Sequence, residues 1–405
     1  MQFFGGGDWI GNIIWFFLFF VFILLYPRMM IYQMVTKIEK NIVELEKMVD
    51  VGRDKISKKI TRKPDRKVKE KINNFMEFFI GAPVTLDPYG IVGKIHKVLK
   101  HAEKREIGFV KQIAPNLSDD EVMDISAAIQ HNSGIHQIVK ILRHYLEIIK
   151  KYKILQLGMI IQMQLPLIRK IADALEKSVD AFVDNAPIGD GIAPLVIASM
   201  IPAKAKVHEM KEEEFAYYKT KIEGRTVILS KASGPGTTIG YPGKFVEKIA
   251  KKYKINRIIT VDAAGALEGE KDGVIMEGVG VGKRGGELIS YHGYQIEELA
   301  LKKNIPVDSI GIKEVSENAI YPMKEEIYKA LPGTVEKIKE MVSWGPRKET
   351  ILVLGFGNTS GIGNNSRTMK ETEAKIKKNI KKMKKEEEER KKKENRFWNR
   401  FLSPF

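Results

Sequence analysis

Three residues of this 405-residue chain have side chains and sequence surroundings typical of an acid–base or metal site. Asp190 lies between two glycines in "PIGDGIAP", Asp262 directly follows the hydrophobic run "IITV", and His292 precedes "GYQIEELAL". Two carboxylates and one imidazole from separate loops could hold one divalent metal ion and leave coordination positions open. Without a metal, Asp190 and Asp262 could share a proton, one acting as base and the other as acid.

Each residue also has a purely structural interpretation. Asp190 could cap the apolar helix that follows, because aspartate accepts hydrogen bonds from the free N–H groups of a first helical turn. Asp262 could cap a turn, and His292 could cap the helix that it precedes. Glu268 in "LEGEKDG" is close enough in sequence to Asp262 to assist a metal ligand, or it could simply face water.

Composition limits the chemistry. The chain contains no cysteine, which excludes disulfides, a cysteine nucleophile and a thiolate metal site, and we expect no haem. Any metal would therefore be held by His, Asp and Glu side chains. The formal net charge of +17 favours an anionic partner, either lipid headgroups or RNA.

The elements that must position the three residues lie in region 181–365. Runs rich in β-branched residues alternate there with helical segments such as "GKFVEKIAKKYK". This alternation predicts an α/β domain, a mostly parallel sheet flanked by helices. The strands expected to share that sheet are 225–230, 256–261, 309–313 and 351–354. Ligands bind such sheets at the carboxyl ends of the strands, where Asp262 is expected.

Glycine-rich loops follow several of these strands. They contain Gly234 and Gly236 in "SGPGTTIGYPG", Gly280 and Gly282 in "GVGVGKRGG", and Gly355 and Gly357 in "GFGNTSGIG". Backbone N–H groups in such loops can bind phosphate. However, the first and last loops do not fit the P-loop pattern, and "GFG" lacks the third glycine of the dinucleotide fingerprint. We therefore favour tight turns beside the site.

The N-terminal region 1–35 is expected to be a transmembrane anchor. No charge occurs from Ile10 to Tyr26, and the stretch as a whole is long enough to cross a bilayer. A signal peptide is not favoured, since a basic start and a cleavage site are missing. Only Asp8 precedes the span and Arg28 begins a series of basic residues after it. The positive-inside rule thus predicts a single-pass protein of the cell membrane with its N-terminus outside and its bulk cytoplasmic.

Three further regions complete the chain. Region 36–75 is a basic juxtamembrane helix or stalk that either contacts anionic headgroups or is simply solvated. Region 76–180 has helical periodicity, including a capping-box pattern at Ser118 and Glu121, and should form an all-helical domain. Region 366–405 is a charged helix with a basic, aromatic end that contacts a membrane surface, contacts RNA, or is solvated.

The order of these motifs resembles the hydrogenase maturation endopeptidases and, more distantly, the germination (spore) proteases. "DNAPIGDGIAPLVI" resembles their acidic turn, although Asp190 stands where the hydrogenase enzymes usually have Glu. "IITVDAA" places Asp262 after the expected strand, and "YHGYQIEELALKKNIPVDSIGI" places His292 at the position of a metal ligand. Over its whole length the chain is similar to an archaeal membrane-anchored family known as domain of unknown function 1512.

The leading hypothesis is a membrane-anchored, cytoplasm-facing hydrolase acting on a protein or peptide, a metal-assisted or aspartic-type endopeptidase. One alternative is a catalytically silent membrane scaffold that binds a protein, lipid or RNA. A second is a nucleotide or nucleoside hydrolase, based on the glycine loops and on the similar sheet topology of phosphorylase-like enzymes. The sequence predicts no particular oligomeric state.

Overall fold

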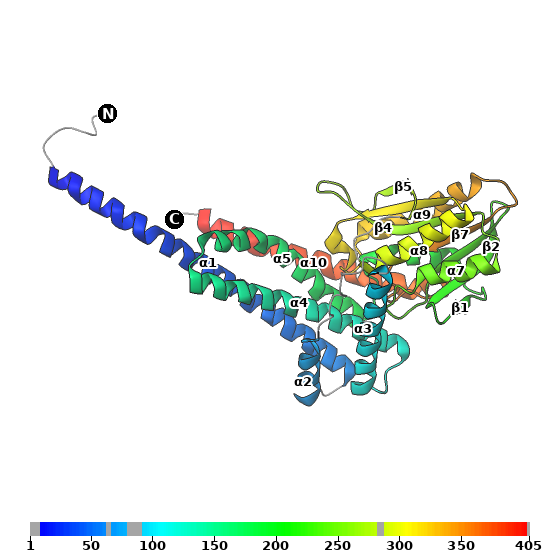
Figure 1. Cartoon of the computed structure of the whole chain (residues 1–405), viewed down its shortest axis with the longest axis horizontal. Helices are drawn as coiled ribbons and strands as arrows, with labels where there is room; N and C mark the ends of the chain where they lie inside the picture. Colours follow the sequence, from blue (N-terminus) through cyan, green and yellow to red (C-terminus); the bar gives the residue numbers. More distant parts are fainter. Residues whose placement is uncertain (1–8, 62–65, 79–90, 282–286, 403–405) are drawn as a thin grey trace.

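One long helix, α1 (Trp9–Ile60), joins the apolar N-terminal stretch to the charged segment after it without interruption. The computed structural model describes residues 9–61, 66–78, 91–281 and 287–402. The N-terminal part of α1 extends beyond the other helices (Figure 1). By length and composition it is able to cross a membrane, and the side chains of its most apolar stretch are exposed.

The rest of α1 packs into a helical bundle. Its main partners form a hairpin of α4 (Asp119–Tyr152) and α5 (Leu155–Val183). Ile38 and Ile42 of α1 are buried in the same core as Leu142 of α4. One face of region 36–60 therefore belongs to the bundle, whereas many residues of its other face are exposed. The shorter helices α2 (Arg66–Phe75) and α3 (Ile91–Ile113) complete the helical half.

Local sequence signals explain the start of α4. Ser118 accepts a hydrogen bond from the backbone N–H of Glu121, whose carboxylate accepts one from the backbone N–H of Ser118. This reciprocal arrangement is the predicted capping box, and it satisfies two otherwise unpaired donors.

The second half contains one seven-stranded sheet in the order β1-β2-β3-β7-β4-β6-β5. The neighbours β3, β7, β4 and β6 pair in parallel, and the pairs β1–β2, β2–β3 and β5–β6 are antiparallel. All four strands expected to share a sheet do so. The strands are β1 (His208–Met210), β2 (Phe215–Ile222), β3 (Arg225–Ala232), β4 (Arg257–Gly265), β5 (Ile275–Val279), β6 (Val307–Glu314) and β7 (Thr350–Gly355).

Helices cover both faces of the sheet. The core on one face includes α6 (Ile192–Met200) and α9 (Glu325–Ser343), and the other includes α7 (Pro242–Lys252) and α8 (Glu287–Lys303). Val261 and Ala263 of β4 belong to the α6–α9 core. Because successive side chains of a strand point to opposite faces, Asp262 points toward α7 and α8.

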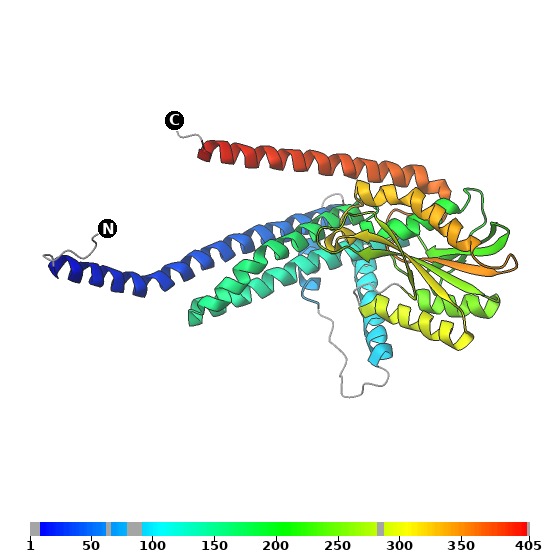
Figure 2. The same ribbon diagram turned by 90° about the horizontal axis from the view of Figure 1, so that it is seen from above.

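The C-terminal helix α10 (Met369–Leu402) begins against the sheet and then runs back along the helical half. Ile376 is buried in the α6–α9 core, and Lys177 of α5 forms a 2.7 Å ion pair with Glu386. Figure 2 shows that α10 ends on the same side of the molecule as the start of α1. The charged C-terminal helix that the sequence predicts is thus present.

Candidate functional site

The structure brings Asp190, Asp262 and His292 together around one small cavity. The cavity has a volume of about 20 Å³, which is sufficient for a single water molecule. Its other lining residues are Ile239, Pro242, Phe356 and Gly357. They come from the segments that follow β3 and β7, so the cavity lies at the carboxyl ends of the parallel strands, as the sheet topology predicts.

Asp262 is held by the centre of the sheet. Its strand, β4, lies between β6 and β7, and Asp262 itself pairs with Gly311 of β6. The N–H of Phe356 donates a 2.8 Å hydrogen bond to the carbonyl of Val261, which fixes the exit of β7 beside Asp262. The residue is only 7% exposed. A carboxylate in this place has a rigid backbone and little access to bulk water.

Asp190 lies on a short 3₁₀ turn, Gly189–Gly191, directly before α6. Its Oδ2 atom accepts a 3.0 Å hydrogen bond from the backbone N–H of Asn358, in the loop after β7. The N-cap position of helix α6 is Gly191, so Asp190 is the residue before the cap, and its carboxylate binds the loop after β7. A Cβ atom on Gly189 would come within 2.1 Å of the carbonyl of Asn318, so only glycine fits there.

His292 lies within α8, whereas the sequence pattern placed it ahead of the helix. The structure corrects that boundary, since α8 begins at Glu287, and it removes a capping role for His292. The ring is 1% exposed, and its Nδ1 atom lies 3.3 Å from Oε1 of Gln295, one turn further along. The ring of Tyr241 approaches it edge-on with a centroid distance of 6.0 Å. The imidazole on helix α8 therefore lies on the side of the cavity opposite α6.

The three side chains do not form a metal-binding set in this arrangement. Across the ranges that the structure describes, no group of three or more His, Asp and Glu side chains is placed to hold a metal ion. Glu268 is exposed in the turn after β4 and does not line the cavity. In this arrangement the two carboxyl groups and the imidazole can themselves accept and donate protons.

The glycine loops bring segments of backbone into close contact. A Cβ atom on Gly357, whose φ is +133°, would lie 2.0 Å from the carbonyl oxygen of Asp190. A Cβ on Gly234 would lie 2.0 Å from the carbonyl of Ile362. Gly236 and Gly355 are also tightly packed. Gly280 has a positive φ, and an added Cβ would meet only Oε1 of Glu297, at 3.9 Å. Gly282 lies outside the described residues. At Gly234 and Gly357 the loops are therefore packed directly against neighbouring backbone.

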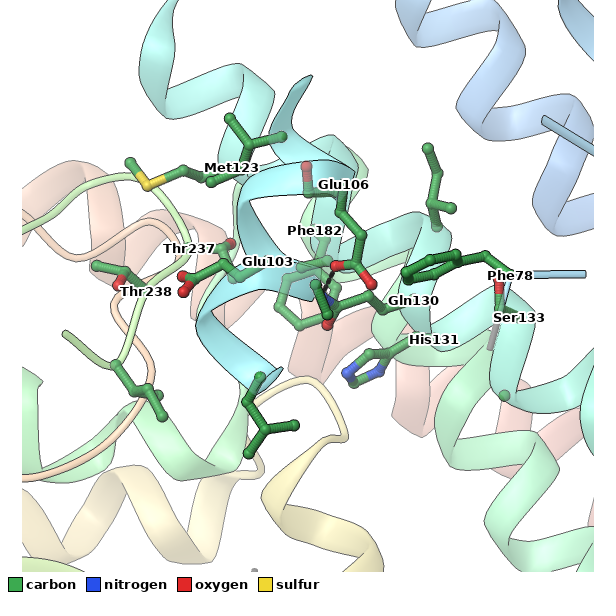
Figure 3. Close-up of a pocket in the computed structure, with 18 of the residues that line it drawn as sticks. Phe78, Glu103, Glu106, Met123, Gln130, His131, Ser133, Phe182, Thr237 and Thr238 are labelled. Atoms are coloured by element: carbon green, nitrogen blue, oxygen red, sulfur yellow. Dashed lines mark hydrogen bonds between the residues drawn. The ribbon is translucent and has the colours of Figure 1, made fainter. Parts of the chain in front are cut away.

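A second cavity of about 700 Å³ adjoins the first. It is formed mainly by α3, α4 and the segment 237–241, and Ile239 lines both cavities. Asn358 connects them as well, since it lines the larger cavity while its N–H binds Asp190. Figure 3 shows the Glu106 side chain reaching from α3 toward Gln130 of α4, with His131 and Phe182 nearby.

Both halves of the chain match one family. Residues 12–185 match the N-terminal domain of a protein family of unknown function, DUF1512, and residues 188–363 match its C-terminal domain. The chain belongs to the DUF1512 family. A comparison with curated proteins finds no match. In this DUF1512 protein Asp190, Asp262 and His292 all lie in the C-terminal domain, whereas both domains contribute to the larger cavity.

The larger cavity of the DUF1512 chain contains titratable groups that the sequence patterns did not single out. Burial raises the pKa of Glu106 to about 7, and burial also raises the pKa of Glu103, which accepts a 2.7 Å hydrogen bond from the Tyr241 hydroxyl. Burial lowers the pKa of His131 to about 4, so its ring is neutral at pH 7. In the sequence Glu103 and Glu106 resemble ordinary solvated positions of a charged helix, and only the packing of α3 on α4 distinguishes them.

Proposed function

We propose that this DUF1512 protein is a membrane-anchored hydrolase that cleaves peptide bonds with Asp190, Asp262 and His292. The observation that carries the proposal is the meeting of these three residues, from distant parts of the chain, around one water-sized cavity. The adjoining cavity of about 700 Å³ has the volume of a typical ligand site, which a short peptide segment can occupy. The likeness of the three sequence motifs to those of endopeptidases supports the same reaction.

The proposed reaction needs one water molecule and two carboxyl groups. One ionised carboxylate, Asp190 or Asp262, accepts a proton from the water molecule. At the same time the oxygen of that water bonds to the peptide carbonyl carbon. The other, in its protonated form, donates a proton to the leaving nitrogen as the C–N bond breaks. His292 lies against the same cavity and can hold or pass a proton between the two steps. Acid–base catalysis of this kind contributes roughly 10²–10⁴-fold to a rate.

The anchor in this proposal is the exposed apolar part of α1. The connection between α4 and α5 lies beside the point where that part ends, because a Cβ atom on Gly158 of α5 would lie 3.0 Å from Sδ of Met34. Tyr152 at this connection is 61% exposed. Its neighbours in sequence are the basic residues Lys150, Lys151 and Lys153.

An aromatic side chain among lysines suits the headgroup layer of a membrane that contains anionic lipid. We therefore propose that the helical hairpin and the basic tail contact lipid rather than RNA. The excess of basic residues after the span supports a cytoplasmic position for the bulk of the chain.

A peptide-library assay tests the proposed activity. The full chain is reconstituted in nanodiscs, incubated with a mixed peptide library, and the products are identified by mass spectrometry. We expect new peptide termini with the native protein, none above background with Asp262→Asn, and native activity with Glu268→Gln, a carboxylate of the same segment outside the cavity. Equal cleavage by native protein and Asp262→Asn, or no cleavage by either, would refute the proposal.

A further inference from the structure

The cavity of about 700 Å³ has apolar walls and an acidic interior. Phe75 and Phe78 line the cavity and stack with a centroid distance of 5.3 Å. Phe182 and His131 also line it, and their rings form a T-shaped pair. Glu103 and Glu106 also line the cavity, on the same face of α3. Apolar walls with a few polar groups are the usual composition of a site that binds a ligand.

The two carboxylates of this cavity accept hydrogen bonds from neutral groups. Glu106 is 8% exposed and accepts a hydrogen bond from the amide of Gln130, and Glu103 accepts one from Tyr241. Among the described residues, neither carboxylate forms an ion pair with a lysine or arginine. The nearby ammonium group of Lys100 lies over the Tyr241 ring, 4.5 Å from its centroid. A buried carboxylate without a counter-charge, such as Glu106, is costly, and a cation in the cavity would offset that cost.

Ser126 provides an independent sign that the cavity takes a ligand. This residue of α4 lines the cavity and is 6% exposed. Its hydroxyl oxygen is buried and makes no hydrogen bond with any described residue. A buried hydroxyl without a partner costs about 1–3 kcal/mol, so a polar group supplied from within the cavity is expected to satisfy it.

We propose that this cavity binds a peptide segment with a lysine or arginine side chain directed at Glu106 and apolar neighbours against the aromatic wall. Polar atoms of the bound segment would lie within reach of Ser126. This inference rests on the proposed function where it treats the bound peptide as a substrate. It then specifies which substrates are preferred. Binding itself requires only the cavity.

The test compares three probe peptides that differ only at the central residue. Acetyl-Leu-Lys-Leu-amide, its norleucine analogue and its glutamate analogue are titrated by calorimetry at pH 8 into the full chain in nanodiscs. The protein carries Asp262→Asn to prevent cleavage. We expect the lysine peptide to bind about 30-fold more tightly than the norleucine peptide, the usual size of a buried charge interaction, and the glutamate peptide to bind least.

Two variants locate the preference. Glu106→Gln keeps a hydrogen-bonding partner for Gln130 and should reduce the preference for lysine to about threefold or less. Glu336→Gln, an exposed substitution on α9, should leave the preference unchanged. Equal affinity for the lysine and norleucine peptides, no binding of any peptide, or a preference that survives Glu106→Gln would overturn the inference. The first comparison does not depend on how any Glu106 variant folds.

The outcomes also separate this inference from the proposed function. Lysine-selective binding that depends on Glu106, without any cleavage by the native protein, supports the binding site and refutes the hydrolase. Cleavage that depends on Asp262 but shows no preference for a basic residue supports the hydrolase and overturns the binding inference.

Discussion

The backbone N–H of Asn358 donates a 3.0 Å hydrogen bond to the carboxylate of Asp190, across a separation of 168 residues. This bond joins the turn before α6 to the loop after β7, and Gly357 lies at their point of closest approach. The same loop supplies Phe356 and Gly357 to the wall of the small cavity. The position of Asp190 in the site is therefore set by a contact between two loops that are remote in sequence.

Substitution Gly357→Ala should destabilise the protein by about 3 kcal/mol or more. The new Cβ atom would overlap the carbonyl oxygen of Asp190, and a φ of +133° is unfavourable for any residue other than glycine. Urea denaturation in detergent measures the effect. The matched substitution Gly265→Ala, where no atom lies within 4 Å of the added Cβ, should cost less than about 1 kcal/mol. Equal stability of the two variants would show that the loops are not in contact.

Substitution Glu106→Gln should stabilise the protein at alkaline pH. In the folded chain burial raises the pKa of Glu106 to about 7, from an ordinary value of 4.5. Between these values the folded state binds a proton that the unfolded state has lost. Native stability must therefore fall, relative to the variant, as pH rises from about 4.5 through 7.

The expected difference between native protein and Glu106→Gln reaches about 3 kcal/mol at pH 8. The other titratable groups that line the same cavity are Glu103, Lys100, His131 and Tyr241, and they are common to both proteins. Denaturation at pH 5, 6.5 and 8 measures the trend. A stability difference that does not change with pH would contradict this prediction, because it would show that the Glu106 carboxyl group is exposed to water.

The connection between α4 and α5 should lie in the headgroup layer. Because the chain contains no cysteine, Tyr152→Cys can be labelled at one position with a fluorophore. In vesicles with anionic lipid, headgroup-attached quenchers should strongly reduce its emission. A label at Leu301→Cys, an exposed position on α8, should be unaffected. Similar quenching at both positions would contradict this placement of the hairpin.

Part of the site could be predicted from sequence because parallel strands direct their carboxyl ends to one edge. The hydrophobic run before Asp262 fixed its place on β4, and the alternation of strands and helices placed the loop after β7 beside it. The beginning of α8 could not be predicted, because the glycines before His292 masked its helical periodicity. The hydrogen bond from Asn358 to Asp190 was also hidden, since hydrogen bonds between distant loops leave no local pattern.

The larger cavity could not be predicted from the sequence for a related reason. Its walls come from α3, α4, α5 and the segment after β3, and each contributes residues that are ordinary for a packed or solvated helix. The buried face of α1 was likewise missed, because its many charges suggested a solvated segment although Ile38 and Ile42 are spaced for packing.

The rate at which Asp262→Asn cleaves a peptide, relative to the native protein, decides whether the small cavity is the active site. The peptide is one that the native protein cleaves in the library assay, and kcat/KM is measured for both proteins in nanodiscs. Removing one acid–base group from the cavity should reduce kcat/KM by about 100-fold or more, with an unchanged unfolding midpoint as the control for folding. Retention of native kcat/KM by a folded Asp262→Asn protein would contradict the claim that this cavity is the active site.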